Sequence, residues 1–126
     1  MSATVSVTQA TLGNPDNTQN YLVVRGTISL TGSYAAGGDV LSFAGVSDLI
    51  KSGEPPVEVR IYETTPAANG PGSGYAFNFL PGTTQANGAM TVFNGTSQFS
   101  GSYGSPPFSV TNFQLSFTAY FPIFQN

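Results

Sequence analysis

Few side chains in this chain of 126 residues can transfer a proton near neutral pH or hold a metal ion. The sequence contains no histidine and no cysteine. It therefore lacks the commonest general base and the commonest transition-metal ligand, and it offers no disulfide, thiolate metal site or cysteine nucleophile. Six carboxylates remain, so any acid–base or metal chemistry has to be built from these and from hydroxyl groups.

The carboxylates do not follow the spacing of a known catalytic or metal site. Asp39, Asp48 and Glu54 are available as ligands for a hard cation, but they form no calcium-loop motif, and Asp39 follows two glycines as in a turn. Glu58 and Glu63, the candidate pair for glycoside hydrolysis, fall on opposite faces of a strand. No serine lies in a Gly-x-Ser-x-Gly elbow. We expect a protein that is not an enzyme and has no cofactor and no metal.

Charged residues are scarce and unevenly distributed. They make up 7% of the chain, against about a quarter in ordinary soluble domains, and residues 64–126 contain none. Only Arg25, Lys51 and Arg60 are cationic, so the chain cannot neutralise a phosphate backbone and we expect no nucleic-acid partner. The neutral half is explained either by burial against partner proteins or by a larger share of the core.

Alternation of apolar and polar residues predicts strands along most of the chain. In the clearest run, Leu22, Val24, Ile28 and Leu30 share one face, with Gly26 between them. The longest run covers residues 108–121, and its in-phase apolar residues are Phe113, Leu115, Phe117, Ala119 and Phe121. Because Phe108 and Val110 are out of phase with this set, we expect a β-bulge near residues 111–112.

Shorter runs and turn signals complete the predicted architecture. Further strands are expected at residues 4–8, 40–44, 57–63, 75–80, 89–93 and 98–103. Asn94-Gly95 predicts a hairpin, although Asn94-Gly95-Thr96 also matches a glycosylation pattern. Residues 45–56 and 64–74 are expected to be loops, the first with a helical turn capped by Ser47. About eight strands predict one all-β domain over residues 1–126, an antiparallel β-sandwich of the jelly-roll or Greek-key type.

Several of these stretches are similar to one kind of viral protein. Thr31–Asp39 (TGSYAAGGD) resembles the TGSYATGGD-like stretch of small proteins encoded near the major capsid gene of tailed bacteriophages. Residues 74–84, Gly88–Phe93 and the aromatic-rich Phe117–Phe121 are similar to the second half of such proteins. Residues 94–112 depart from the pattern, because they are more polar and richer in turns. The chain therefore resembles capsid decoration, or cement, proteins.

The resemblance implies a structural virion protein that binds the outer surface of a phage capsid. Such a protein stabilises contacts between capsomers as a homotrimer, with the major capsid protein as its partner. No apolar run approaches the roughly 20 residues that span a bilayer, and Met1–Thr4 shows no signal-peptide pattern. We therefore expect synthesis in the host cytoplasm, location on the virion and no membrane partner.

Two other functions fit the same sequence. One is a structural protein of the phage tail or baseplate, which would share the β-rich, weakly charged composition. The other is the carbohydrate-binding module of a receptor-binding protein. Such modules stack sugars on exposed aromatic side chains, and in the absence of tryptophan the candidates are Tyr34, Tyr62, Tyr75 and Tyr103.

The two ends of the chain supply the candidate contacts with other subunits or with the capsid. Residues 1–20 form either an edge strand or an arm that reaches the capsid. The apolar tail from Phe121 either packs into its own core or onto a neighbouring subunit. The candidate contact residues are Leu12, Asn14, Pro15, Phe121, Ile123 and Phe124.

Overall fold

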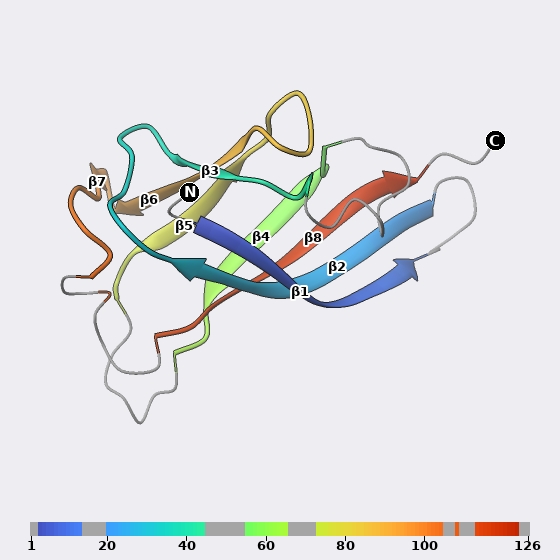
Figure 1. Cartoon of the computed structure of the whole chain (residues 1–126), viewed down its shortest axis with the longest axis horizontal. Helices are drawn as coiled ribbons and strands as arrows, with labels where there is room; N and C mark the ends of the chain where they lie inside the picture. Colours follow the sequence, from blue (N-terminus) through green and yellow to red (C-terminus); the bar gives the residue numbers. More distant parts are fainter. Residues whose placement is uncertain are drawn as a thin grey trace.

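The computed structural model describes residues 3–13, 20–44, 55–65, 73–104, 108 and 113–123, with residues 9–13, 20–21 and 123 described by their backbone (Figure 1). This part of the chain contains eight strands in two antiparallel sheets and no α-helix. The predicted all-β class and the single-domain β-sandwich are therefore confirmed. Within the same residues no helix is long and apolar enough to cross a membrane.

Sheet 1 contains four strands in the order β1-β2-β8-β4. Strands β1 (Ala3–Gly13) and β2 (Asn20–Leu30) are the longest and pair along their whole length, with a bulge between Val7 and Gln9. Strand β8 (Leu115–Ile123) is central, because it pairs with β2 on one side and with β4 (Glu58–Glu63) on the other. The last strand of the sequence thus joins the N-terminal hairpin to β4.

Sheet 2 is built around β6 (Gly88–Asn94). Strand β5 (Ala76–Leu80) pairs along β6, and β3 (Asp39–Leu41) pairs with the start of β6. Strand β7 (Ser97–Gln98) pairs with the end of β6 and forms a hairpin with it. In Figure 1 this sheet lies above sheet 1, with β3 next to β1 and β4 next to β5 at the edges.

Aromatic side chains fill the space between the sheets. Phe43, which follows β3, is fully buried and contacts Phe117 and Phe121 of β8 edge-to-face, with ring centroids 5.5 and 5.4 Å apart. It also contacts Phe79 of β5. A second cluster of rings at the other end of the sandwich centres on Phe108. Because such pairs add about 0.5–1.5 kcal/mol beyond area burial, these clusters hold the sheets together.

The predicted strand faces are confirmed where one face meets the core. In β2, Leu22, Val24 and Ile28 are buried while Arg25 and Thr27 are exposed. In β8 the predicted inward set is buried, and Phe113 before it is partly buried. Most described phenylalanines of residues 64–126 pack in or against the core. For these side chains, the explanation that the uncharged half supplies a larger share of the core is confirmed.

Four predictions about the elements are corrected, refined or fall outside the described residues. The strand predicted at residues 98–103 ends at Gln98, because the backbone of the following residues changes partner: Phe99 still donates to Val92 of β6, but Tyr103 donates to the Gly32 carbonyl. The hairpin is confirmed, but Asn94 pairs with Ser97 as a strand residue, and Gly95, with φ 63°, begins the turn. The bulge at residues 111–112 and the helical turn after Ser47 lie outside the described residues.

Candidate functional site

The candidate contact residues at the chain ends do not form one exposed site. Phe121 is fully buried against Phe43, so its prediction as a contact residue is wrong, and the alternative that it packs into its own core is confirmed. Leu12 and Ile123 are strand residues by register, opposite Leu22 and Asn20, and their side chains are not described. Asn14, Pro15 and Phe124 lie outside the described residues. Their roles stay predictions.

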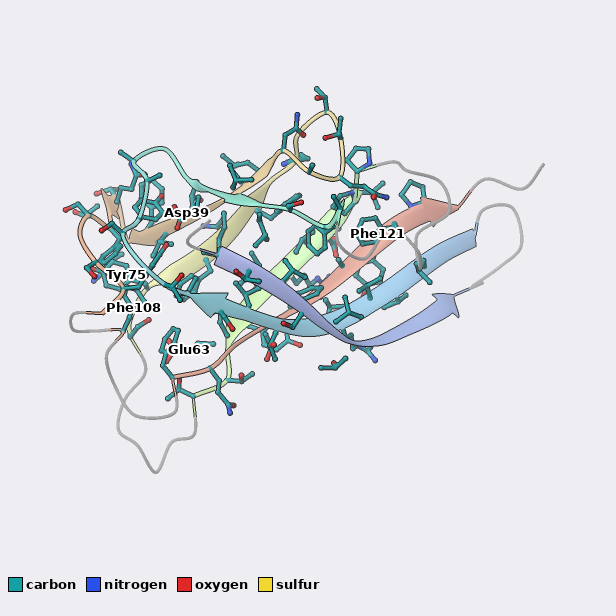
Figure 2. All side chains as sticks on the ribbon, in the orientation of Figure 1. Asp39, Glu63, Tyr75, Phe108 and Phe121 are labelled. Carbon is teal, nitrogen blue, oxygen red and sulfur yellow. The ribbon has the colours of Figure 1, made fainter. Side chains whose placement is uncertain are left out.

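Three of the four tyrosines considered for sugar stacking are not exposed platforms. Tyr34 and Tyr103 are 7% and 4% exposed, because both belong to the core between β3 and β7. Tyr75 packs on Phe99 and Phe108, with ring centroids 5.5 and 5.4 Å apart. Figure 2 shows Tyr75 and Phe108 close together at the end of the sandwich opposite Phe121. Only Tyr62, 43% exposed, presents a free ring.

A buried polar cluster fixes the Thr31–Asp39 stretch that carries the resemblance. Asp39 is 2% exposed, and its carboxylate accepts hydrogen bonds from the Ala35 N–H at 2.8 Å and the Tyr103 hydroxyl at 2.5 Å. The Tyr34 hydroxyl donates to Gln98 Oε1 at 2.7 Å. Burial, and then the hydrogen bond to Asp39, raises the pKa of Tyr103 far above its ordinary value, so this hydroxyl stays a donor at physiological pH. The cluster thus ties the Thr31–Asp39 stretch to Gln98 and Tyr103.

The candidate cation and hydrolase carboxylates are not brought together. Asp39 is enclosed by its hydrogen bonds, while Asp48 and Glu54 lie outside the described residues. Glu58 is exposed on the outer face of sheet 1, and Glu63 turns inward to accept hydrogen bonds from the N–H and Oγ of Ser73. The described residues contain no cluster of three acidic side chains that could hold a metal ion.

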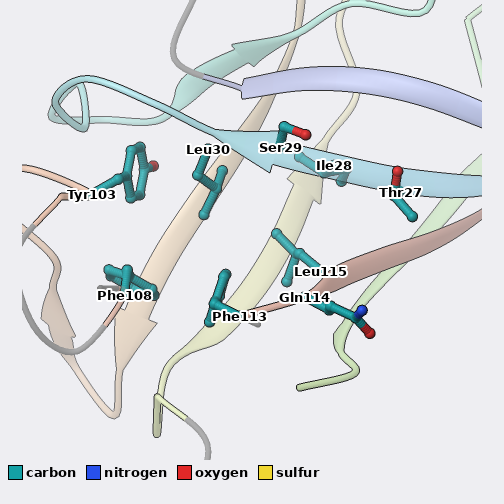
Figure 3. Close-up of a pocket in the computed structure, with 9 residues that line it drawn as sticks. All are labelled: Thr27, Ile28, Ser29, Leu30, Tyr103, Phe108, Phe113, Gln114 and Leu115. Atoms are coloured by element: carbon teal, nitrogen blue, oxygen red, sulfur yellow. The ribbon is translucent and has the colours of Figure 1, made fainter. Parts of the chain in front are cut away.

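A pocket of about 570 Å³ opens where β2 and the start of β8 diverge (Figure 3). Its walls carry apolar and neutral polar side chains. The described lining residues are Thr27, Ile28, Ser29, Leu30, Tyr103, Phe108, Phe113, Gln114 and Leu115. These side chains include no carboxylate and no cation, so what they offer a ligand is an apolar surface and a few neutral hydrogen bonds.

The outer face of sheet 2 carries a row of exposed apolar side chains. Register places Val40, Ala89 and Leu80 side by side on β3, β6 and β5. Val40 is 47% exposed and Leu80 is 50% exposed. Phe93 and Ala76 are paired further along the same face. Among the described residues of these strands the one charged side chain is Asp39, which points into the core.

The outer face of sheet 1 has the opposite character. Arg25, Thr118 and Arg60 lie in one row across β2, β8 and β4, and Glu58 and Tyr120 lie in the next. Arg60 Nε donates to Glu58 Oε1 at 3.0 Å. The remaining outward residues are mainly serine and threonine. The exposed charges of the described chain are thus collected on this face.

The residues that distinguish the two faces were not among the sequence candidates. Val40, Leu80 and Tyr120 each alternate out of phase with the core set of their strands, and that phase is the signal that predicts an outward side chain. Their assembly into rows depends on strand order, which the sequence does not display.

Comparison with protein-family models, with curated protein sequences and with solved structures gave no significant match.

Proposed function

We propose that this chain is a structural virion protein of the capsid-decoration type. In this proposal it binds the outer surface of a phage capsid and stabilises contacts between capsomers, as a homotrimer with the major capsid protein as its partner. The observation that carries the proposal is the apolar row of Val40, Ala89 and Leu80 on a sheet face whose described outward side chains carry no charge.

Desolvation supports a protein surface as the occupant of this face. A charged side chain brought into an interface without a partner costs several kcal/mol, whereas an apolar side chain gains about 25 cal/mol for each Å² removed from water. Interface cores are accordingly poor in charged residues. The outer face of sheet 2 fits that description, and the charged face of sheet 1 fits a surface that stays in water.

Rigid strands and a contact repeated in three copies allow a small contact area in each subunit. The contact residues lie on paired strands, so little conformational entropy is lost on binding. Three copies held together would engage the shell at once, and the second and third contacts would profit from a high effective concentration. A small apolar row in each subunit is then sufficient for stable attachment.

A place in the tail or baseplate is the remaining structural alternative. It would use the same neutral face against a different protein lattice, and no feature of the described residues favours it. The location of the chain in the particle separates the two assignments.

Co-sedimentation with purified phage capsids that lack the chain tests the proposed docking face. Leu80→Asp should weaken binding at least about tenfold, which corresponds to 1.4 kcal/mol, because it places a charge in the apolar row. Tyr62→Asp, an equally drastic change at a 43% exposed site on the opposite face, should bind like the wild type. Circular dichroism of both variants checks that they fold.

Three results would contradict the proposal. Failure of the wild type to sediment with capsids would remove the assigned function. Loss of binding in Tyr62→Asp with normal binding in Leu80→Asp would move the contact to sheet 1. Light scattering that gives the 13.1 kDa mass of one chain at high concentration, rather than three times that mass, would remove the trimer.

A further inference from the structure

We propose that a shallow groove on the outer face of sheet 1 binds a neutral hexopyranose that presents two neighbouring free hydroxyl groups. The described lining residues are Val57, Glu58, Arg60 and Tyr120. This site lies on the sheet face opposite the proposed capsid contact, and the inference does not depend on that contact.

The groove is formed by β4, an edge strand of sheet 1, and its neighbour β8. Glu58 lies directly opposite Tyr120 in the strand register, and the Val57 N–H donates to the Tyr120 carbonyl at 2.9 Å. The volume is about 340 Å³, at the small end of ligand sites, which run from about 300 to 1,000 Å³. A single sugar ring, rather than a larger organic molecule, fits this size.

The groove joins an aromatic ring to an exposed apolar side chain. Tyr120 is partly exposed, and Val57 is 60% exposed although it is branched and apolar. A pyranose has one face of C–H groups and an edge of hydroxyl groups. The C–H face gains from contact with an aromatic surface, and tyrosine combines an apolar ring with a polar end.

The Glu58–Arg60 pair supplies matched polar groups at the edge of this surface. The contact between Arg60 Nε and Glu58 Oε1 is 3.0 Å long, and within the described residues it is the only side-chain hydrogen bond of either group. It uses one of the five N–H donors of the guanidinium and one carboxylate oxygen. Neighbouring sugar hydroxyls can therefore donate to the second Glu58 oxygen and accept from the remaining Arg60 N–H groups.

The charges of the groove select a neutral ligand. Glu58 and Arg60 have opposite charges and hold each other in place, so the four described lining residues have no net charge. An anionic sugar that pairs with Arg60 would place its carboxylate beside Glu58, and a cationic group that pairs with Glu58 would lie beside Arg60. A diol instead satisfies both members of the pair and leaves the ion pair intact.

Saturation-transfer difference NMR and amide shift titration of the full chain test the site. The probes are the methyl glycosides of glucose, mannose and galactose, with the methyl glycoside of sialic acid as the anionic comparison. At least one neutral probe should bind with a millimolar dissociation constant, since a shallow groove encloses one side of the ring. Shifts should concentrate at residues 57–60 and 118–122.

Matched variants decide which side chains carry the binding. Arg60→Ala and Tyr120→Ala should each weaken binding at least about tenfold, whereas Tyr62→Ala, on the same face but outside the lining, should bind like the wild type. Arg60 is 71% exposed, so its variant is expected to fold, which circular dichroism checks. A deoxy analogue of the bound glycoside that lacks one of the two hydroxyls should lose binding as well.

The inference fails on any of three results. The first is that no neutral probe binds at 100 mM, a concentration about a hundredfold above a dissociation constant of 1 mM. The second is that the sialoside binds more tightly than every neutral probe. The third is that Arg60→Ala and Tyr120→Ala both bind like the wild type. Mannan, β-glucan and galactan serve as competitors. Displacement of the glycoside by a polymer identifies the sugar as part of a chain, and lack of displacement identifies it as free; both outcomes support the site.

Discussion

The hydrogen bond from Tyr103 to Asp39 gives a sharp test of the buried polar cluster. Tyr103→Phe removes one oxygen atom and leaves the ring, which packs on Phe99 and Phe108 with centroids 5.7 and 5.5 Å apart. The perturbation is therefore confined to the hydroxyl that lies 2.5 Å from Asp39 Oδ2.

The expected loss is about 2 kcal/mol. Hydrogen bonds to charged groups contribute about 1.5–3 kcal/mol, and a carboxylate that is 2% exposed cannot replace the lost donor with bulk water. The hydrogen bond from the Ala35 N–H to Asp39 Oδ1 remains. The carboxylate therefore keeps one donor, and the loss should stay below about 3 kcal/mol. With a urea slope of about 2 kcal/mol/M, the unfolding midpoint should fall by about 1 M.

Urea unfolding followed by circular dichroism measures this shift. Tyr62→Phe is the matched control, because the Tyr62 hydroxyl lies on the surface and contacts Thr118 Oγ1 at 3.4 Å. Its free energy of unfolding should change by less than about 0.5 kcal/mol. A double-mutant cycle with Asp39→Asn should give a coupling of at least about 1 kcal/mol. Equal midpoints for Tyr103→Phe and Tyr62→Phe would refute the reasoning.

Three further predictions concern the fold. Gly26→Ala should lower stability in urea by more than about 2 kcal/mol, because its Cβ would lie 1.9 Å from the Ser6 carbonyl oxygen; wild-type stability would contradict the β1–β2 register. Burial raises the pKa of Tyr34 and Tyr103. Below about pH 10 both tyrosines are neutral in the folded and unfolded chain. Their contribution to the free energy of unfolding is therefore complete below this pH and is lost as pH rises toward their pKa values in the folded chain. In a spectrophotometric titration they should ionise only with alkaline unfolding, and reversible ionisation of all six tyrosines in the folded chain would contradict this. Burial raises the pKa of Glu63, but hydrogen bonds outweigh it and the net pKa is lowered. The Glu63 carboxylate therefore stabilises the fold above the ordinary glutamate pKa, and this stabilisation is lost as pH falls through the pKa of the folded chain. In Glu63→Gln the melting temperature should fall less steeply with decreasing pH; an unchanged dependence on pH would contradict this prediction.

Local alternation predicted the strands that have one face in the core. In β2 and β8 every second residue meets the opposite sheet, so burial enforces a period of two that is visible in the sequence. β1 extends to Gly13, well beyond the predicted residues 4–8, because its partner β2 continues alongside it. That extension depends on pairing, which alternation in one strand does not reveal.

The end of β7 shows where local patterns fail. Residues 98–103 alternate like a strand, and the Phe99 N–H still donates to the Val92 carbonyl of β6, but beyond it the backbone bonds to residues 32–34 instead. Phe99 and Tyr103 fill the core, and the Tyr103 hydroxyl donates to Asp39. A buried carboxylate needs donors, and the Tyr103 hydroxyl of this segment supplies one. The partner of Asp39 lies 64 residues away in the sequence, beyond the range of any local motif.

The candidate faces depend on register across strands that are distant in the sequence. Val40, Ala89 and Leu80 are adjacent only because β3 and β5 flank β6. The groove likewise needs β4 beside the last strand, so that Tyr120 meets Glu58. The sequence indicated the neutral composition of residues 64–126, whereas the division into a neutral face and a charged face required the fold.

Electron microscopy of the intact virion tests the proposed function most directly. The account predicts density for this chain on the outer surface of the capsid, in groups of three, with the Val40–Ala89–Leu80 row against the shell and Arg60 facing the solvent. Density confined to the tail, or a subunit seated on the shell through the outer face of sheet 1, would contradict it.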